Sequence, residues 1–350
     1  MTALLASPIA LASEHRYRRL PVLPLKPQVK ELPSLSIIIP ARNEASNLSR
    51  LLPSLAKTSY PGTIELIVVD DCSSDKTAQI AQSHNLKLIR LSQLPDGWSG
   101  KTYACHQGAN AASGEWLLFT DADTIHHTDG PASSVAYAVA NGLDGLSIFF
   151  KHNTSGVIDT LALSVAFAGL FVGLGKDIPI INGQYFLVRR KTYQEVNGFA
   201  SVAGERLEDL AIGRRLRQKG YVIPLLRSEA VAEVQMYIDI KSLWQGLSRF
   251  SPGSLRWLGT RSILVALFIT GVMTPILALI SALTSHRSRK WAALSWATVS
   301  VAFIPWMRRF GHPRLALLAP LGALLVQAAS IFGIARRVLG LGTLWKGRRV

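Results

Sequence analysis

The stretch Trp116–Thr124, WLLFTDADT, is an apolar run that ends in two carboxylates one residue apart. Successive side chains of a strand point to opposite faces, so a strand continued through this stretch would aim Asp121 and Asp123 the same way. Neither aspartate has a basic residue within two positions. A divalent cation, Mg²⁺ or Mn²⁺, is a candidate counter-charge because hard cations prefer oxygen ligands. A solvated acidic turn after a buried strand is the simpler alternative, and residues elsewhere in the chain decide between the two.

Apolar runs and helical patterns alternate along the first part of the chain. The predicted strands are Leu35–Pro40, Ile64–Val69, Leu86–Leu91 and Trp116–Thr120. Strands separated by helices at this spacing predict an α/β fold, with a parallel sheet covered by helices on both faces. Ligands bind such sheets beyond the carboxyl ends of the strands. Polar clusters at 40–44, 70–75 and 121–123 follow three of these strands, so we expect them to form one site.

Two familiar phosphate-binding motifs are excluded by spacing. Gly100-Lys101-Thr102 resembles the end of a P-loop, but Pro95 stands where that motif needs its first glycine. No G-x-G-x-x-G follows the first strand, so the turn of a dinucleotide-binding fold is missing. Lys101 still begins a predicted helix, where phosphate is favoured. An ordinary surface lysine at a helix start is the alternative.

The charge distribution separates the chain into two parts. All 22 acidic residues precede residue 261, whereas residues 261–350 carry 12 of the 38 basic residues and no acid. Because the basic excess is interleaved with apolar runs, it favours anionic lipid headgroups as partners and argues against nucleic acid. The two cysteines, Cys72 and Cys105, form no spaced disulfide framework, which indicates a reducing, cytosolic setting.

Three uncharged apolar segments follow residue 261. They are Ser262–Leu283, Trp291–Met307 and Leu315–Ala335. The first and third are long enough to span a hydrocarbon layer of roughly 30 Å, and the middle one is marginal. Three crossings would place the basic C-terminal tail opposite the preceding domain, against the positive-inside tendency. The sequence leaves the number and orientation of crossings open.

Four motifs in order resemble those of family 2 glycosyltransferases with the GT-A fold. They are IIIPARNE at 37–44, VVDDCSSD at 68–75, Asp121-Ala122-Asp123 and Glu208-Asp209. The resemblance covers about residues 34–250. Leu94–Lys101 and the tail WKGRR at 345–349 are similar to the membrane-bound branch that includes carotenoid- and hopanoid-associated glycosyltransferases.

The resemblance implies a fold and a domain order. We expect a GT-A domain with a mixed, mainly parallel sheet at 34–236, and a C-terminal α-helical membrane domain with a basic tail at 261–350. Residues 237–260 contain apolar side chains at helical spacing beside basic ones, which predicts an amphipathic helix in the membrane surface. Residues 1–33 are expected to be a surface anchor or a frayed tail.

The resemblance also implies roles for particular residues. Donor binding falls to Pro40, Ala41, Asn43, Glu44, Asp70, Asp71, Lys101, Asp121, Gly183, Gln184 and Glu208. Lys101 would face the diphosphate of a nucleotide-diphosphate sugar, and Asp121 and Asp123 would hold the metal. Gly183 would permit close approach of a ligand, with Gln184 as a hydrogen-bond donor beside it.

Asp209 is the predicted general base. Direct displacement at an anomeric carbon inverts its configuration and needs a carboxylate to take the proton of the acceptor hydroxyl. Asp209 lies in the first turn of a predicted helix that runs to about Gln218, where the helix dipole favours its ionised form. Acids are also common in first helical turns for structural reasons alone. Together with the upstream aspartates, the residue favours the catalytic role.

These observations predict an inverting hexosyltransferase at the cytosolic face of the cytoplasmic or another internal membrane. Its acceptor would be a lipid-soluble hydroxyl compound, with a carotenoid or other isoprenoid lipid favoured. A polyprenyl-phosphate sugar transferase and a non-catalytic membrane protein that keeps the fold are the alternatives. The sugar, the nucleotide, the acceptor and the oligomeric state stay open.

Overall fold

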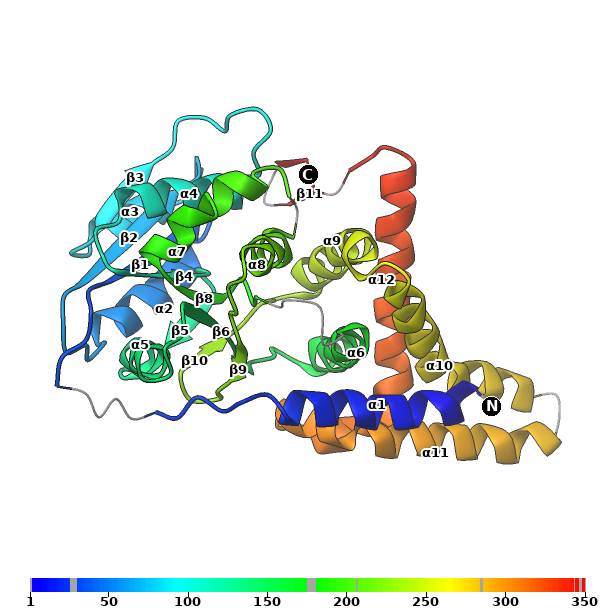
Figure 1. The fold of residues 1–350 in the computed structure, drawn as a ribbon. Coiled ribbons are helices and arrows are strands. Elements are labelled where there is room, and N and C mark those ends of the chain that lie inside the picture. Colours follow the sequence, from blue (N-terminus) through cyan, green and yellow to red (C-terminus); the bar gives the residue numbers. More distant parts are fainter. Residues whose placement is uncertain are drawn as a thin grey trace. The chain divides into compact units, whose positions relative to one another are not determined.

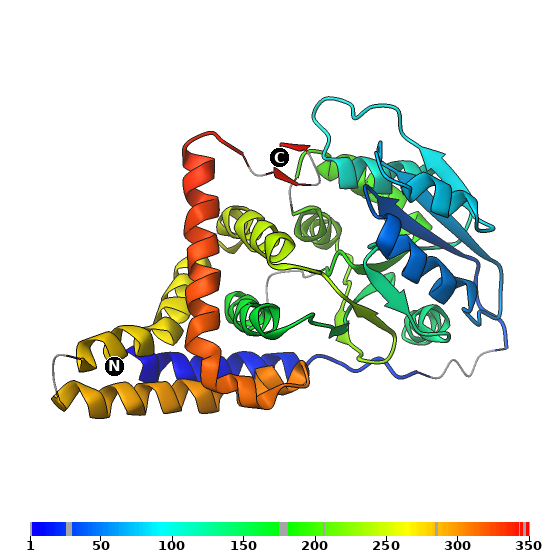
Figure 2. The same ribbon diagram turned by 180° about the vertical axis from the view of Figure 1, so that it is seen from behind.

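The computed structural model forms two compact units (Figures 1 and 2). The α/β unit comprises Leu20–Lys151 and Ile178–Val234, and the helical unit comprises Met1–Arg19, His152–Asp177 and Gln235–Val350. The structure describes residues 2–25, 30–174, 181–205, 207–283, 286–342, 344–345 and 348–349. At residues 251–258, 286–287, 344–345 and 348–349 only the backbone is described. Residues 346 and 347 of the basic tail therefore lie outside the described residues.

A seven-stranded sheet of order β3-β2-β1-β4-β8-β6-β9 organises the α/β unit. In that order its strands are Lys87–Arg90, Ile64–Asp70, Leu35–Ala41, Trp116–Thr120, Tyr185–Arg189, Gly145–Phe149 and Leu225–Arg227. Strand β1 runs parallel to β2 and β4, whereas β8 runs antiparallel to β4 and β6. The prediction of a mixed, mainly parallel sheet is confirmed, and four predicted strands are present within one residue at each end.

Helices cover the sheet on both faces. They are α2 (Ala45–Ala56), α3 (Thr77–Gln82), α4 (Gly100–Ala111), α5 (Gly130–Ala140), α7 (Arg190–Glu195), α8 (Glu208–Gln218) and the 3₁₀ turn η1 (Gly198–Val202). Strands β1 and β4 are almost wholly buried, as continuous apolar runs are when a sheet is covered on both sides. Gly108 brings α4 close to the sheet, because a Cβ there would lie 2.4 Å from Cγ2 of Ile38.

Parallel register gathers the carboxyl ends of β1, β2 and β4 at one edge. Ala41 pairs with Asp70, and Ile38 pairs with Phe119. The polar clusters that follow these three strands consequently lie at the same edge, as expected. Beyond β4, a short strand β5 (Thr124–His126) pairs with β10 (Ala232–Val234). Strand β7 (Lys151–His152) lies where the first of the two segments of the α/β unit ends.

The helical unit is assembled from segments far apart in sequence. It contains α1 (Thr2–Arg18), α6 (Val157–Gly173), α9 (Ile240–Leu258), α10 (Arg261–Ala282), α11 (His286–Arg309), η2 (Pro313–Leu318), α12 (Ala319–Val338) and the strand pair β11 (Leu344–Trp345) and β12 (Arg348–Arg349). Both views show α1 lying along α11. The Trp306 indole donates to Ser13 Oγ at 3.1 Å, and Arg309 lies 3.2 Å from Glu14. The N-terminal residues are thus a packed helix, and the expectation of a frayed tail is wrong.

Two helices meet the length and composition needed to cross a membrane among the described residues. They are Arg261–Ala282 and Pro313–Val338, whereas α11, which contains the middle predicted segment, does not qualify. In the described part of α9 the apolar face is partly covered by protein: Leu243 and Leu247 are buried, and Trp244 packs on Phe332 of α12. Among the described side chains of this segment, Ile238, Ile240 and Phe250 are exposed and could contact a membrane surface.

Candidate active site

The candidate site begins at the first turn of α8, where Glu208 and Asp209 stand side by side. Asp209 Oδ1 accepts a hydrogen bond of 2.8 Å from the backbone N–H of Leu210. Burial and the neighbouring Glu208 carboxylate raise the pKa of Asp209 to about 7, although Lys101 and the backbone N–H groups of Leu210 and Gly183 oppose the shift. A carboxyl group with a pKa near neutrality is suited to accept a proton in a reaction run near pH 7.

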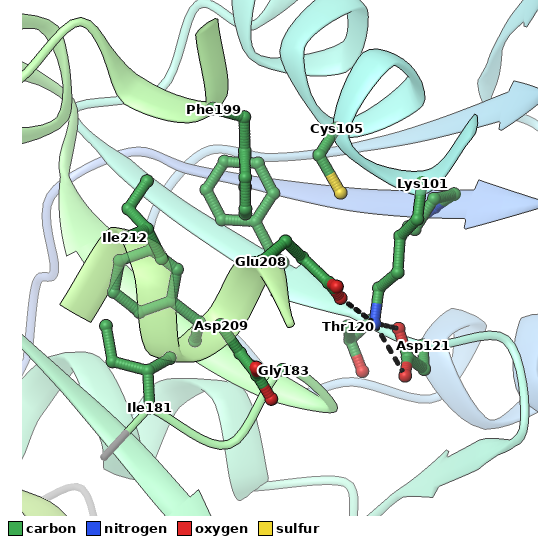
Figure 3. A pocket seen from close by; sticks show the side chains of 13 residues that line it. Lys101, Cys105, Thr120, Asp121, Ile181, Gly183, Phe199, Glu208, Asp209 and Ile212 are labelled. Atoms are coloured by element: carbon green, nitrogen blue, oxygen red, sulfur yellow. Dashed lines mark hydrogen bonds and ion pairs between the residues drawn. The ribbon is translucent and has the colours of Figure 1, made fainter. Parts of the chain in front are cut away.

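Lys101 projects from the start of α4 into a group of carboxylate oxygens (Figure 3). Its Nζ lies 2.7 Å from Oδ1 and 3.0 Å from Oδ2 of Asp121, and 3.0 Å from Oε1 of Glu208. Burial would lower the pKa of Lys101, but the charges of Asp121 and Glu208 outweigh it and hold the pKa well above the ordinary lysine value. Lys101 is therefore a fixed positive charge between the end of β4 and the start of α8.

Gly183 leaves room for this cluster. A Cβ at this position would lie 3.2 Å from Cβ of Asp209, 3.3 Å from its Oδ2 and 3.4 Å from Nζ of Lys101. Any larger side chain at residue 183 would project toward the proposed base and the lysine. The predicted importance of this glycine thus has a geometric reason, although its contact with a ligand remains a prediction.

A hollow of about 290 Å³ opens at this cluster. Its lining consists of Pro40, Lys101, Cys105, Phe119, Thr120, Asp121, Ile181, Gly183, Phe186, Phe199, Glu208, Asp209 and Ile212. The hollow marks the place at which Lys101, Glu208 and Asp209 come together.

The apolar side of the hollow was not foreseen from the sequence. Phe119 stacks on Phe186 with ring centroids 5.7 Å apart and meets Phe199 edge-on at 5.0 Å. Cys105 is buried beside them, and burial raises the pKa of its thiol far above the ordinary value, so the thiol stays neutral. No motif singled out these side chains, because apolar residues in buried strands and helices look alike whether or not they line a pocket.

Asp121 and Asp123 are arranged differently from the expectation. Strand β4 ends at Thr120, and the backbone turns at residues 122 and 123, with the Thr124 N–H donating to the Asp121 carbonyl at 3.3 Å. The strand-alternation argument is wrong, because the extended backbone stops before the first aspartate. Asp121 lines the hollow, whereas Asp123 is not among the described residues that do so.

The donor set of this turn suits a hard divalent cation. Carboxylate oxygens are the ligands that Mg²⁺ and Mn²⁺ prefer, and Mg²⁺ usually takes only one or two from the protein, with substrate phosphates and water completing the shell. In the part of the chain that the structure describes, no group of three or more His, Cys, Asp or Glu side chains is placed to hold a metal. The residues thus fit a cation that is shared with a diphosphate.

The predicted nucleotide-binding residues Asp70 and Asn43 form hydrogen bonds with the loop that follows β2. Asp70 is buried, and its Oδ1 accepts from the Ser73 N–H at 3.0 Å. Asn43, in a left-handed conformation with φ of 50°, accepts from the Ser74 N–H at 2.9 Å. These bonds shape the strand-end loops, and direct contact with a nucleotide stays a prediction.

The remaining predicted donor-binding residues lie at the same sheet edge. The buried Asp71 lies 4.0 Å from Arg42, and Glu44 accepts from the Asn47 amide at 2.6 Å. Gln184 contributes its backbone carbonyl, which accepts from the Asp121 N–H at 3.4 Å. Ala41 ends strand β1. Among the predicted site residues that the structure describes, the hollow itself gathers Pro40, Lys101, Asp121, Gly183, Glu208 and Asp209.

Known proteins share this fold. A mannosyltransferase from Pyrobaculum calidifontis, solved with GDP-Man and Mn²⁺, matches 88% of this chain and 95% of its own with a TM-score of 0.55 at 17% sequence identity. At that identity the likeness concerns the fold alone. The sheet topology and this match define the α/β unit as a GT-A glycosyltransferase fold.

Sequence comparisons agree with that class. Residues 36–196 match the model of the family described as Glycosyl transferase family 2. A 4,4'-diaponeurosporenoate glycosyltransferase of Staphylococcus haemolyticus is 26% identical over 230 residues, 62% of this chain and 60% of that protein. The protein of the same description from Staphylococcus aureus strain USA300 is 27% identical over 293 residues, 80% of this chain and 77% of that protein. The α/β unit thus carries a domain of glycosyltransferase family 2 over residues 36–196.

Proposed function

We propose that this glycosyltransferase uses a nucleotide-diphosphate sugar and transfers one sugar, with inversion, to a lipid-soluble hydroxyl acceptor. The observation that carries the proposal is Asp209, a carboxylate with a pKa near 7 beside a lysine and a second carboxylate in one hollow. The acceptor oxygen forms a bond to the anomeric carbon as the bond to the diphosphate breaks. Asp209 takes the acceptor proton, and the diphosphate leaves with the bonding electrons.

The leaving diphosphate carries negative charge that the site must stabilise. Lys101 supplies one positive charge at the start of a helix, where anions are favoured. Asp121, with Asp123, would hold a divalent cation, which would offset the charge developing on the leaving group. The solved mannosyltransferase, which contains Mn²⁺ and GDP-Man, supports a donor and cation of these classes.

A carotenoid or related isoprenoid is the proposed acceptor class. The relatives at 26% and 27% identity are described as diaponeurosporenoate glycosyltransferases, and such an acceptor is apolar enough to reside in a bilayer. The helical unit supports a membrane location, because α10 and α12 are long and apolar and expose side chains such as Leu267 and Ile331. The α/β unit would then act at the cytosolic face.

The relatives' description suggests a second candidate bond. Diaponeurosporenoate is named as a carboxylate, and transfer to a carboxylate oxygen would form a sugar ester. Such an acceptor has no proton to give at neutral pH, so Asp209 would not be needed as a base. A lipid phosphate is the third possible acceptor, and its product would be a sugar phosphate.

The experiment uses membranes from cells that express the protein, each of several labelled nucleotide sugars, and a lipid extract analysed by mass. A glycoside of a hydroxyl survives both alkali and mild acid, an ester is cleaved by alkali, and a sugar phosphate is cleaved by mild acid. We expect one hexose to be added and the product to survive both treatments. An alkali-labile product would show that the acceptor is a carboxylate and not a hydroxyl. The absence of any labelled lipid would contradict the proposed function.

A further inference from the structure

Lys101 is placed so that it satisfies the carboxylate that a divalent cation would use. Both oxygens of Asp121 lie within 3.0 Å of its Nζ. A cation bound to the same carboxylate would lie next to the ammonium group, and two adjacent positive charges repel strongly in a partly buried site.

Glu208 gives Lys101 a second anchor. Its Oε1 lies 3.0 Å from Nζ, so the side chain can leave Asp121 and keep one ion pair. The Lys101 side chain is about one-third exposed, and the Asp121 side chain about one-quarter, so the pair can be reached from solvent. The lysine therefore has a second position available on the side of α8.

We propose that Lys101 is an internal counter-cation of the donor site: it neutralises Asp121 until a diphosphate draws it away, and only then does a divalent cation bind Asp121. This inference rests on the proposed cation role of Asp121. It assigns Lys101 a positioning role besides its predicted contact with the diphosphate. The reciprocity of binding equilibria then makes the diphosphate and the cation bind cooperatively through one side chain.

The test measures Mn²⁺ binding alone, by electron paramagnetic resonance, to the full chain in detergent without any nucleotide. Lys101→Met removes the ammonium group and keeps an unbranched side chain that is only one atom shorter. We therefore expect it to bind Mn²⁺ roughly tenfold or more tighter than the wild type, within the usual range of such couplings. The gain should vanish in the double variant Lys101→Met with Asp121→Asn, because the cation then loses its ligand.

Lys151→Met is the matched control. Lys151 also forms an ion pair, 3.5 Å from Glu233, and it does not line the hollow, so its loss should leave Mn²⁺ binding unchanged. Should Lys101→Met fold poorly by circular dichroism, Lys101→Gln replaces it with the same expectation.

Tight Mn²⁺ binding that is equal in the wild type and Lys101→Met would overturn this inference and leave the cation site in place. Binding to neither protein would also overturn this inference, because removal of the lysine charge should by itself make the cation site available. Transfer of sugar to lipid is not needed for any of these readouts, so the outcome is independent of the acceptor.

Discussion

The two units of this chain differ in how far their large apolar side chains are exposed. In the α/β unit most large apolar side chains are buried or half-buried, and among those described the exposed ones are Val22, Val139 and Val222. In the helical unit, helices α1, α10, α11 and α12 all expose large apolar side chains, with Leu5, Leu267 and Val301 each more than 60% exposed. The first pattern is that of a protein unit in water, and the second is that of a surface that meets something apolar.

The difference separates where the chemistry lies from where the acceptor would be held. Titratable groups with functional placement lie in the α/β unit, which has a closed core and polar strand ends. In the helical unit, the described helices α10 and α12 carry charged residues only near their ends. The exposed apolar side chains between those ends have no titratable group among them. Substitutions in the two units should therefore affect different measurements.

The largest effect is expected from Asp209→Asn in the α/β unit. The amide keeps the shape of the side chain but cannot accept a proton, so turnover should fall by roughly 10²-fold or more with little change in the Michaelis constant for the donor. Wild-type turnover should also decline as the pH drops below about 7, because the Asp209 carboxyl is then protonated. Turnover at saturating donor between pH 5.5 and 8.5 measures both.

Asp129→Asn is the control, since Asp129 precedes helix α5 and makes no side-chain cap bond there. Its turnover should match the wild type. The melting temperature of Asp209→Asn should not fall at pH 8, because the raised pKa means that the ionised carboxyl is disfavoured in the folded state. If the Asp209→Asn variant is destabilised but fully active, Asp209 is not the general base and only stabilises the start of α8. Glu208 would then be the next candidate for the base.

A smaller, several-fold effect is expected from charges placed on the exposed face of the helical unit. The combined variant Leu5→Glu, Leu279→Glu and Leu294→Glu changes residues on α1, α10 and α11 that are 61%, 52% and 48% exposed. If this face meets lipid, the three carboxylates disfavour its contact with the apolar chains, and binding to vesicles of mixed anionic lipid should drop. Sedimentation with the vesicles measures it.

Val222→Glu serves as the matched change, because Val222 is 74% exposed in the α/β unit. It should leave vesicle binding unchanged. Equal binding of the triple variant and the wild type would show that the exposed face of the helical unit does not contact lipid, and the two units would then differ in composition without differing in surroundings.

The smallest effect concerns packing within the helical unit. A Cβ added to Gly333 of α12 would lie 2.0 Å from the carbonyl oxygen of Ser248, which is backbone and cannot rotate away. Overpacking of this kind costs about 1–3 kcal/mol, from which the better helix propensity of alanine recovers up to about 1 kcal/mol. Gly333→Ala should thus lower the unfolding free energy of the helical unit, as measured by thermal denaturation in detergent.

Gly169→Ala in α6 is the comparison, since its Cβ would meet Val265 at an ordinary 3.4 Å. It should be neutral or slightly stabilising. Nucleotide binding in the α/β unit should be the same in both glycine variants. Loss of nucleotide binding in Gly333→Ala alone would indicate that the two units unfold together.

Local patterns in the sequence determined the elements and the order of the motifs. The strand at Trp116–Thr120, the start of α8 just before Asp209 and the apolar segments of α10 and α12 could all be recognised from neighbouring residues. Burial on two faces requires a continuous apolar run, and an acid at a helix start is favoured by the helix dipole. Such signals act over a few residues and are visible without the fold.

Only the tertiary structure determined which charged side chains form ion pairs and which helix faces pack against each other. Asp121 has no basic neighbour in sequence, yet Lys101 reaches it from the start of α4 and also contacts Glu208. The face of α9 predicted to lie in a membrane is instead covered in part by α12, and the N-terminal residues pack along α11. Contacts between distant segments depend on how helices and strands are stacked, and no local pattern carries that information.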